Sequence, residues 1–255
     1  MSLIIFFLAL VVAFLLYVIL TNRKGTEPQI PEFQAHRGFW LDGEKENSLQ
    51  AFRKAKRLGF KMCELDVQLS QDGIPVVHHD PFLLDLRSQK IFINQLSAQE
   101  LFKQYGVVSL WEVLSDSEGT EMYNVEIKTE HLRFVRIARK VGNLLKDYEG
   151  RVIISSFHPL ALVVAGFHCP KVPKAYLVNN LKLDKWFWLS LIPVKWLHPQ
   201  HELVTPAVLD QMKRRGIKVA VWTVNEEANA HRLLQMGVQS VITDSLLHTA
   251  QRGPA

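Results

Sequence analysis

The sequence predicts an α/β fold in which eight strands and their helices close into a (β/α)8 barrel. From Phe33 onward, short strand-like runs alternate with amphipathic helical stretches, and repeated βα units form a parallel sheet. About eight such units fill a barrel, and the 255 residues of the chain match its usual length of about 250. The content of hydrophobic residues (48%) and of charged residues (22%) indicates neither disorder nor a bundle of membrane helices.

The elements follow from short patterns along the chain. The predicted strands are residues 33–36, 61–67, 74–78, 122–128, 151–156, 173–177, 201–204, 217–222 and 239–242. The predicted helices are residues 48–58, 131–147, 206–215 and 226–236. Glycine is favoured as a left-handed C-cap, and four glycines fall just after helical stretches: Gly59, Gly150, Gly216 and Gly237. Two helix starts are indicated, at Thr205-Pro206 and at Asn225-Glu226-Glu227.

The amino-terminal segment is apolar and uncharged from Leu3 to Leu20, long enough to cross a hydrocarbon core of about 30 Å. No basic residue precedes this run and no Ala-x-Ala site follows it, so it predicts an uncleaved transmembrane anchor rather than a signal peptide. Arg23 and Lys24 follow the run, and the positive-inside rule then predicts that the following domain is cytoplasmic.

The chain therefore divides into an anchor at 1–22, a linker at 23–32 and a barrel domain at 33–250. Two segments break the alternation within the barrel domain. Residues 82–110 form a polar insert with a short helix predicted from Ala98 to Gln104, and residues 181–197 form an apolar segment rich in tryptophan. The Trp-rich segment either packs over the barrel or forms an exposed lip that enters the membrane interface, where tryptophan is favoured.

The overall charge is modestly basic, with a formal net charge of +5 and a pI near 9.2. This charge favours anionic lipid surfaces or phosphate-bearing substrates. Nucleic acid is not the predicted partner, because no compact Lys/Arg stripe is interleaved with aromatic residues. Cys63 and Cys169 match no metal or redox spacing and are interpreted as two buried thiols.

Carboxylates with the same strand spacing point to a metal site. Glu64 and Asp66 lie two residues apart in a predicted strand, so they share one face, opposite Leu65. Such a pair repels unless a cation neutralises it, and hard oxygen ligands suit Mg²⁺ or Ca²⁺. Glu126 and Lys128 repeat the spacing, which adds a third carboxylate and a cation for phosphate. The alternative for both pairs is an exposed, solvated strand.

Histidines end two of the predicted strands. His36 stands at the end of the first strand, and His78 and His79 stand at the end of the third. A single histidine is more often structural than catalytic, but barrels of this type carry their active sites at the carboxyl ends of the strands. Histidines at two strand ends, with carboxylates at the neighbouring ones, therefore indicate an enzyme site.

These residues resemble the motifs of the glycerophosphodiester phosphodiesterase family. The matching pieces, which run in family order from about residue 34 to 245, are His36-Arg37-Gly38, Glu46-Asn47-Ser48, Glu64-Leu65-Asp66-Val67, Asp72-Gly73-Ile74-Pro75-Val76-Val77-His78-His79-Asp80, Glu126-Ile127-Lys128, Val221-Trp222-Thr223-Val224-Asn225 and Thr243-Asp244. The resemblance implies a TIM barrel of the phospholipase-C-like phosphodiesterase type. Two departures concern the pocket: the usual Thr-Gly pattern is missing from residues 82–95, and Ser48 stands where threonine is commoner.

By position, the resemblance also implies roles for individual residues. Glu64, Asp66 and Glu126 become ligands of a divalent metal, Mg²⁺ or Ca²⁺, with Glu46 close to the metal or the substrate. His36 and His79 become the acid–base pair; His79 matches rather than His78 because it directly precedes an aspartate. Arg37 and Lys128 become phosphate contacts, and Trp222 lines the substrate pocket.

The implied reaction is hydrolysis of glycerophosphodiesters to glycerol 3-phosphate and an alcohol. Membrane-tethered members of the family include enzymes that act as lysophospholipase D, so a lysophospholipid substrate that yields lysophosphatidic acid is the alternative. A second alternative is a lyase related to phospholipase C or sphingomyelinase D, which the Glu126 and Trp222 motifs disfavour. A non-enzymatic lipid-binding barrel would show a degenerate site, yet every expected catalytic position is filled.

Overall fold

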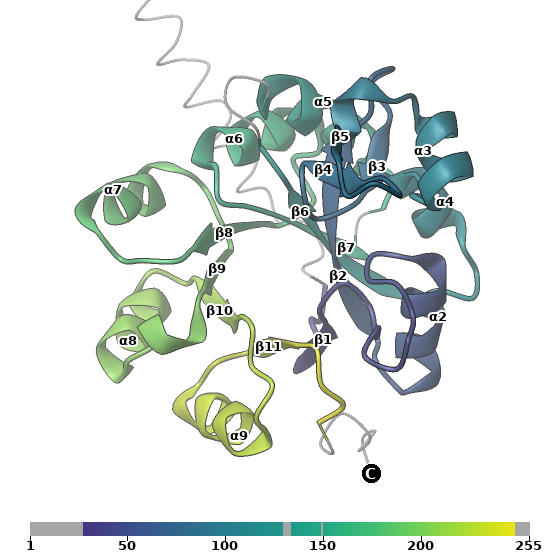
Figure 1. Cartoon of the computed structure of the whole chain (residues 1–255). Helices are drawn as coiled ribbons and strands as arrows, with labels where there is room; N and C mark the ends of the chain where they lie inside the picture. The colour runs from purple at the N-terminus through teal and green to yellow at the C-terminus, as the bar shows by residue number, and fades with distance from the viewer. Residues whose placement is uncertain (1–27, 130–133, 149, 248–255) are drawn as a thin grey trace, which may run out of the picture.

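The computed structural model describes residues 28–129, 134–148 and 150–247. In this part of the chain, eight parallel strands form a closed ring that is surrounded by helices (Figure 1). The strands are β1 (Phe33–Ala35), β2 (Met62–Leu69), β6 (Met122–Ile127), β7 (Val152–Ser156), β8 (Lys174–Val178), β9 (Trp196–Pro199), β10 (Lys218–Val221) and β11 (Ser240–Thr243). Strand β1 closes the ring because it pairs with both β2 and β11. The predicted barrel is therefore confirmed.

The helices of the outer ring carry the signals that the sequence predicts. They are α2 (Leu49–Arg57), α5 (Phe134–Leu145), α6 (Pro159–His168), α7 (Leu183–Leu191), α8 (Pro206–Arg214) and α9 (Glu227–Met236). The Ser48 hydroxyl accepts a hydrogen bond from the backbone N–H of Ala51 and so caps α2, as Thr205 caps α8. Gly237 ends α9 with a φ of 106°, a left-handed conformation that favours glycine.

The strand predicted at 74–78 is real but does not belong to the parallel ring. It forms β3 (Pro75–Val77), which runs antiparallel to β2. The connection at Asp72-Gly73 is a tight turn, whereas a parallel crossover needs a dozen residues or more. Strand β3 thus returns the chain to the carboxyl ends of the barrel strands, where the N–H of His78 donates to the carbonyl of Asp66 at 2.9 Å.

The strand predicted at 201–204 is wrong. That segment is the 3₁₀ helix η3 (His201–Leu203), and the true strand is β9, which begins inside the Trp-rich segment. Trp196 is fully buried in the barrel, so this tryptophan is an inward strand residue and not part of a surface lip. In α7, Leu189 packs inward, whereas Leu183 and Phe187 are exposed. Membrane contact by this helix stays a prediction.

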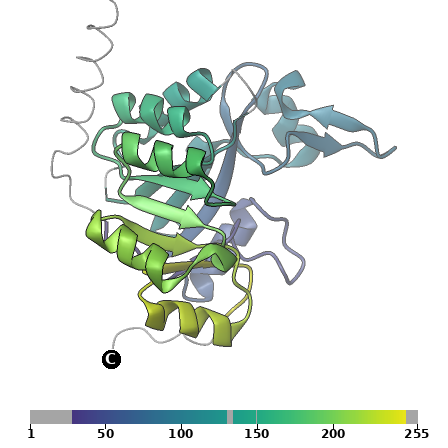
Figure 2. The ribbon, with the colours of Figure 1, turned by 90° about the vertical axis from the view of Figure 1, so that its left-hand side faces the viewer.

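The insert at 82–110 forms a small unit beside the barrel. It contains the hairpin of β4 (Phe82–Leu84) and β5 (Lys90–Phe92), the 3₁₀ helix η1 (Ile93–Gln95) and helix α3 (Ala98–Tyr105), and α4 (Leu110–Ser115) follows. The predicted helix from Ala98 is confirmed, and Ser97 and Glu100 cap it reciprocally. Figure 2 shows the hairpin projecting beyond the end of the barrel toward which the parallel strands run.

The opposite end of the barrel is apolar. A buried cluster fills it, made of Met62, Ile153, Ala175, Trp196 and Ala220, with Ile30 and Met122 packed against it. The chain enters the barrel at this end, because the carbonyl of Pro31 accepts a hydrogen bond from the Ser240 hydroxyl at 2.7 Å.

The predicted anchor at 1–22 lies outside the described residues, as do residues 23–27 of the predicted linker. Among residues 28–129, 134–148 and 150–247, no helix combines the length and apolarity that a membrane crossing needs.

Candidate active site

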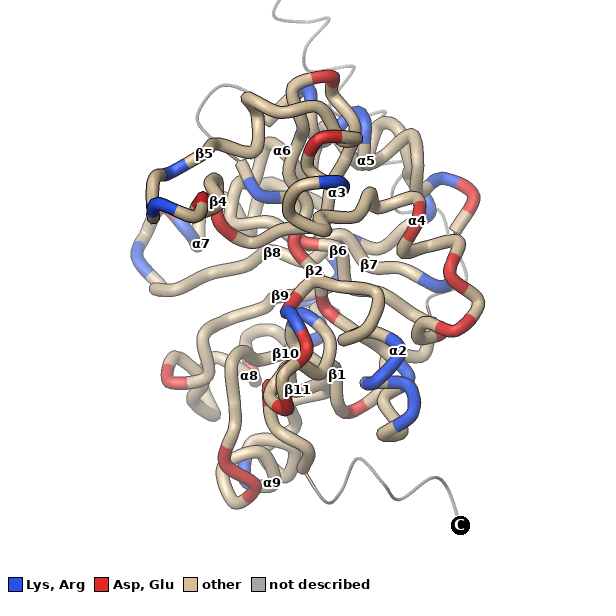
Figure 3. The backbone as a smooth tube through the Cα atoms, turned by 45° about the vertical axis from the view of Figure 1, so that its right-hand side comes forward, with Lys and Arg blue, Asp and Glu red and all other residues tan. Residues whose placement is uncertain are grey.

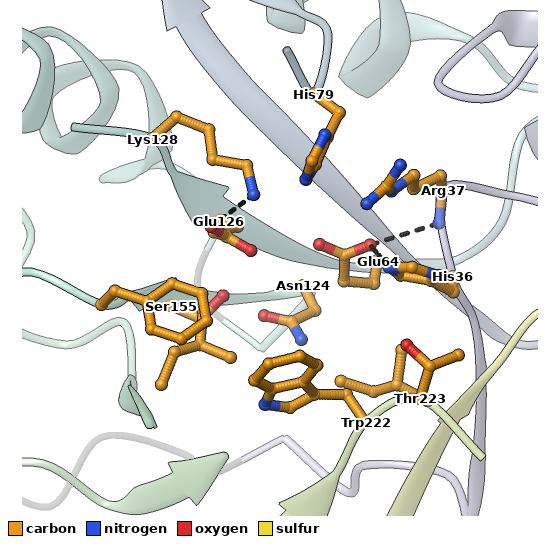
Figure 4. A pocket seen from close by; sticks show the side chains of 13 residues that line it. His36, Arg37, Glu64, His79, Asn124, Glu126, Lys128, Ser155, Trp222 and Thr223 are labelled. Atoms are coloured by element: carbon orange, nitrogen blue, oxygen red, sulfur yellow. Dashed lines mark hydrogen bonds and ion pairs between the residues drawn. The ribbon is translucent and has the colours of Figure 1, made fainter. Parts of the chain in front are cut away.

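Three buried carboxylates gather at the carboxyl ends of two adjacent strands. Glu64 and Asp66 point inward from β2, and Glu126 points inward from β6, where the register pairs it with Asp66. Each can offer an oxygen atom within 4.8 Å of the others. Figure 3 shows acidic positions near the labels of β2 and β6, and Figure 4 shows Glu64 and Glu126 facing one cavity. The period-two pattern of the sequence thus produces a real cluster.

Burial sets the protonation of this cluster. Burial and the nearby charge of Asp66 raise the pKa of Glu64 to about 8, and burial raises the pKa of Glu126. Burial also acts on Asp66, but the charges of Lys128 and Arg37 outweigh it and lower the pKa of that carboxyl. The two cations of the protein therefore do not neutralise the cluster fully. Glu64 in particular would be stabilised in its ionised form by a further positive charge.

Two cations reach the cluster from the protein. The ammonium of Lys128 lies 2.9 Å from Asp66 and 2.7 Å from Glu126. The guanidinium of Arg37 lies 3.3 Å from Asp66, and its backbone N–H donates to Glu64 at 3.2 Å. Arg37 adopts a φ of 57°, a left-handed conformation that is rare outside glycine and that turns its N–H toward Glu64.

The donor set fits a divalent cation. Three carboxylates supply the hard oxygen ligands that Mg²⁺ and Ca²⁺ prefer, and neither thiol nor imidazole stands among them. Glu64, Asp66 and Glu126 would hold the ion. Asn47 orients one of them, because its amide donates to Asp66 at 2.9 Å while its carbonyl oxygen accepts from the Asp66 N–H.

His36 is held by a carboxylate from the other end of the chain. Its Nδ1 lies 2.7 Å from Oδ1 of Asp244, and the amide of Asn225 donates to the second oxygen of Asp244 at 2.9 Å. Burial alone would lower the pKa of His36, but the hydrogen bond with Asp244 and the charge of Glu64 raise it overall. The second ring nitrogen, Nε2, lies 3.9 Å from Glu64 and is available to a substrate there.

His79 faces the same cavity from the loop after β3. Its Nδ1 lies 2.8 Å from Oδ1 of Asp80, whereas the ring of His78 contacts the carbonyl of Phe82 instead. The loop is held from below by Gln68, whose Nε2 lies within hydrogen-bond reach of the carbonyls of His78, His79 and Asp80. Because all three partners are acceptors, the amide nitrogen must be the atom that faces them.

The cavity between the two histidines has a volume of about 220 Å³. One wall is apolar and consists of Phe157, Leu177, Trp222 and Ile242. Trp222 is fixed by its indole N–H, which donates to the carbonyl of His198 at 2.8 Å, and it meets the Phe157 ring edge-on. Pockets for drug-sized ligands measure about 300–1,000 Å³, so this cavity suits a smaller group.

The structure brings eight of the nine predicted site residues to the carboxylates or to the cavity around them: His36, Arg37, Glu64, Asp66, His79, Glu126, Lys128 and Trp222. Glu46 stands one step behind, since its carboxylate bonds to Arg37 at 2.9 Å and is not part of the acidic cluster. Asn47, Gln68, Asp244 and Asn225 received no role from the sequence. Their only signal was their place in or beside the quoted motifs.

Comparison with known proteins agrees with this geometry. Residues 36–248 match the model of the glycerophosphoryl diester phosphodiesterase family. This chain belongs to that family. It is accordingly an enzyme, a glycerophosphodiester phosphodiesterase, and the resemblance seen in the motifs is confirmed.

Similar members come from distant organisms. A glycerophosphodiester phosphodiesterase of Caldanaerobacter subterraneus is 28% identical over 86% of this chain and 97% of its own. A phosphodiesterase of Oleispira antarctica, solved in complex with its product sn-glycerol-3-phosphate, superposes with a TM-score of 0.75 at 26% identity, covering 87% of this chain and 96% of the other. A human lysophospholipase D is 24% identical over 92% of this chain and 90% of its own.

Proposed function

We propose that this enzyme hydrolyses glycerophosphodiesters to glycerol 3-phosphate and an alcohol, with a divalent metal and a pair of histidines. The observation that carries the proposal is the arrangement of His36 and His79. Each bonds an aspartate through Nδ1, at 2.7 Å and 2.8 Å, and each presents its other ring nitrogen to the cavity that the acidic cluster borders. A carboxylate–imidazole pair fixes the tautomer and orientation of the ring, as proton transfer requires.

In this proposal the phosphate lies over the acidic cluster. The metal, when bound by Glu64, Asp66 and Glu126, would neutralise phosphate oxygens and stabilise the charge that grows in the transition state. Arg37 and Lys128 supply further positive charge at the same oxygens.

The two histidines divide the proton transfers. One accepts the proton of the nucleophile, which is the glycerol 2-hydroxyl or water, and the other donates a proton to the leaving alkoxide oxygen. Each transfer typically contributes about 10²- to 10⁴-fold to the rate. The apolar wall at Trp222 and Phe157 excludes water from the side of the cavity opposite the charged groups.

The test is a substrate panel that includes glycerophosphocholine, assayed in EDTA and after addition of Mg²⁺ or Ca²⁺. We expect turnover to be lost in EDTA and to return with one of the two metals, with glycerol 3-phosphate as product. Full turnover in EDTA would remove the metal from the proposal. Glu64→Gln serves as a matched variant, because it keeps the shape of the side chain but cannot neutralise a bound cation.

The alternative substrate is a lysophospholipid, as the name of the human relative indicates for that protein. One feature favours it: the hairpin of β4 and β5, which projects beyond the carboxyl ends of the strands, exposes Leu84 (57%) and Leu86 (107%). The cavity of about 220 Å³ would hold only the head of such a lipid, so an acyl chain would have to lie outside, along this hairpin.

Comparison of glycerophosphocholine with lysophosphatidylcholine decides between the two substrates. A clear preference for the deacylated diester would remove the lipid alternative. The membrane anchor at 1–22 and a cytoplasmic position of the barrel remain part of the proposal and are tested by fractionation and protease protection of the full chain.

A further inference from the structure

Two polar side chains at the bottom of the cavity are not explained by the metal, the phosphate or the histidines. Asn124 lies on β6 two residues before Glu126, so it faces inward directly beneath that carboxylate. Ser155 lies on β7, beside Glu126 in the register. Both residues are 1% exposed, yet both line the cavity, and Figure 4 shows them below the ring of charged groups.

Both side chains keep an atom without a partner. Within the described part of the chain, neither Oδ1 of Asn124 nor Oγ of Ser155 makes a hydrogen bond. A buried polar atom left unpaired costs about 1–3 kcal/mol, so native proteins rarely keep two of them side by side in one cavity. Their position indicates a ligand group that reaches the bottom of the cavity.

A chain of hydrogen bonds fixes which atom of Asn124 faces the cavity. The carbonyl of Pro31 can only accept, so the Ser240 hydroxyl donates to it. Ser240 then accepts from the amide nitrogen of Gln34 at 3.0 Å, and the carbonyl oxygen of Gln34 accepts from the amide nitrogen of Asn124 at 3.2 Å. Each amide orientation follows from the one before it, which leaves Oδ1 of Asn124, an acceptor, toward the cavity.

The chemistry of this pair selects the ligand group. Oδ1 of Asn124 requires a donor, while the Ser155 hydroxyl can donate or accept. A hydroxyl group satisfies both, because it has one hydrogen to give and two lone pairs to offer. A phosphate oxygen, a carbonyl or an ester oxygen has no hydrogen for Asn124, and a methyl group satisfies neither side chain. Apolar contacts from Leu177 and Ile242 on the adjoining wall suit the carbon atoms that carry the hydroxyl.

We infer that Asn124 and Ser155 form a hydroxyl-recognition subsite, which binds the terminal hydroxyl of the glycerol group when its phosphate lies at the acidic cluster. The inference rests on the proposed function and restricts the class of substrate that the site accepts. A substrate acylated on that oxygen has lost the hydrogen that Asn124 needs, and a cavity of about 220 Å³ has no room for its acyl chain. The subsite therefore selects deacylated glycerophosphodiesters over lysophospholipids that are acylated at this position.

The experiment compares glycerophosphocholine with its analogue in which the terminal hydroxyl is replaced by hydrogen. For the wild-type enzyme we expect kcat/KM to fall about 10-fold or more with the analogue, since the buried acceptor is left unpaired. In Ser155→Ala the preference should shrink to about threefold, through a loss with the natural diester alone, because the hydroxyl then keeps one partner, Asn124, instead of two. An unchanged preference in Ser155→Ala, or no preference in the wild-type enzyme, overturns the subsite.

The matched control is Ser156→Ala on the same strand. The Ser156 hydroxyl points away from the cavity and donates to the carbonyl of Ile127 at 2.9 Å. This variant should lose stability but keep the wild-type preference between the two diesters. Equal loss of preference in both variants would show a general effect of strand β7 and would overturn the subsite.

A binding measurement separates this inference from the proposed reaction. Calorimetry with Mg²⁺ compares glycerol 3-phosphate with its analogue that lacks the terminal hydroxyl, and it needs no turnover. Tighter binding of glycerol 3-phosphate by about 10-fold, reduced to about threefold in Ser155→Ala, supports the subsite even if neither diester is hydrolysed. Absence of hydrolysis would refute the proposed reaction alone. Equal binding of the two compounds overturns the subsite whatever the catalytic result.

Discussion

The two ends of the barrel are made by the same strands but have opposite chemistry. Strand β2 carries Met62 at its start and Asp66 further along the same inward face, both 1% exposed or less. At the amino ends such residues form an apolar plug that includes Trp196. At the carboxyl ends they form the acidic cluster and the histidine cavity. Four residues along β2, from Met62 to Asp66, separate a position that stabilises the fold from one whose buried charge destabilises it.

This contrast teaches that stability and chemistry are separable along each strand. The apolar end gains free energy from burial, about 25 cal/mol per Å² of apolar surface. The charged end costs free energy because Glu64 and Glu126 are buried beside other carboxylates, as their raised pKa values reflect. Substitutions at the two ends should therefore have opposite signatures in activity and in stability.

The largest effect is expected at the histidines. His36→Ala or His79→Ala removes one proton transfer and should lower kcat by about 10²- to 10⁴-fold. The melting temperature should stay close to that of the wild-type enzyme, because both rings border an open cavity. Steady-state kinetics and thermal unfolding of each variant check this. Near-wild-type turnover in either variant would refute its assignment.

The opposite signature is expected at the apolar plug. Trp196→Ala removes a fully buried ring, and the free energy of unfolding should fall by about 3–5 kcal/mol. The kcat of the molecules that remain folded should change little, because Trp196 does not line the cavity. Urea unfolding, together with kcat corrected for the folded fraction, measures both quantities. A large loss of kcat without loss of stability would contradict the separation of the two ends.

A smaller effect is expected for Asp244, which positions His36 and does not touch the acidic cluster. Asp244→Asn should lower kcat by about 10- to 100-fold, less than removal of the His36 ring, because the ring stays in place to transfer a proton. The charge of Asp244 helps to raise the pKa of His36, so its loss should move the limb of the pH profile that belongs to His36 to lower pH. A rate loss without this pH shift would indicate a merely structural role.

The smallest effect is the change of metal affinity over one pH unit. With its pKa raised to about 8 from a usual 4.5, Glu64 is protonated in the metal-free folded protein at neutral pH. A metal must displace that proton, so apparent metal affinity should rise by up to about 10-fold per pH unit between pH 6 and 8, then level off. The contribution of the Glu64 proton to the stability of the metal-free protein is fully present below about pH 4.5 and is lost as the pH rises through about 8.

Calorimetric titration of metal at several pH values measures the affinity, and thermal unfolding in EDTA measures the stability. The matched variant is Glu64→Gln, which has no proton to release and should bind metal more weakly with little dependence on pH over this range. A pH-independent affinity in the wild-type protein would contradict the assignment of Glu64 as a ligand.

The sequence predicted the barrel and the acidic cluster because both follow from local patterns. The period-two spacing of Glu64 and Asp66 sets their common direction, and Glu126 repeats it on the next parallel strand. The same local reasoning missed β9, a strand of four residues in which Trp196 and His198 face inward without a run of β-branched residues. It also assigned β3 to the ring, because an antiparallel return leaves no trace in hydropathy.

The supporting residues could not be predicted from local patterns, for a different reason. Asp244 meets His36 across 208 residues of sequence, a contact that exists only because the barrel closes. Asn47 reaches Asp66 because its backbone is left-handed, with a φ of 56°. An asparagine in a sequence does not by itself indicate that conformation. In the sequence Gln68 is one more polar residue of a strand. Its role in holding the His79 loop depends on the antiparallel pairing of β3 with β2.

The closure of the barrel by β1 determines when the active site can form during synthesis of the chain. Strand β1 is made first but needs β11, the last strand, as its second neighbour, and His36 gains Asp244 only then. During synthesis on the ribosome the early strands can collapse, yet the His36–Asp244 pair cannot form until nearly the whole barrel has emerged. Long-range closure of this kind is slow relative to local structure. A nascent chain that has not reached β11 therefore lacks the carboxylate that positions His36, and full activity requires completion of the fold.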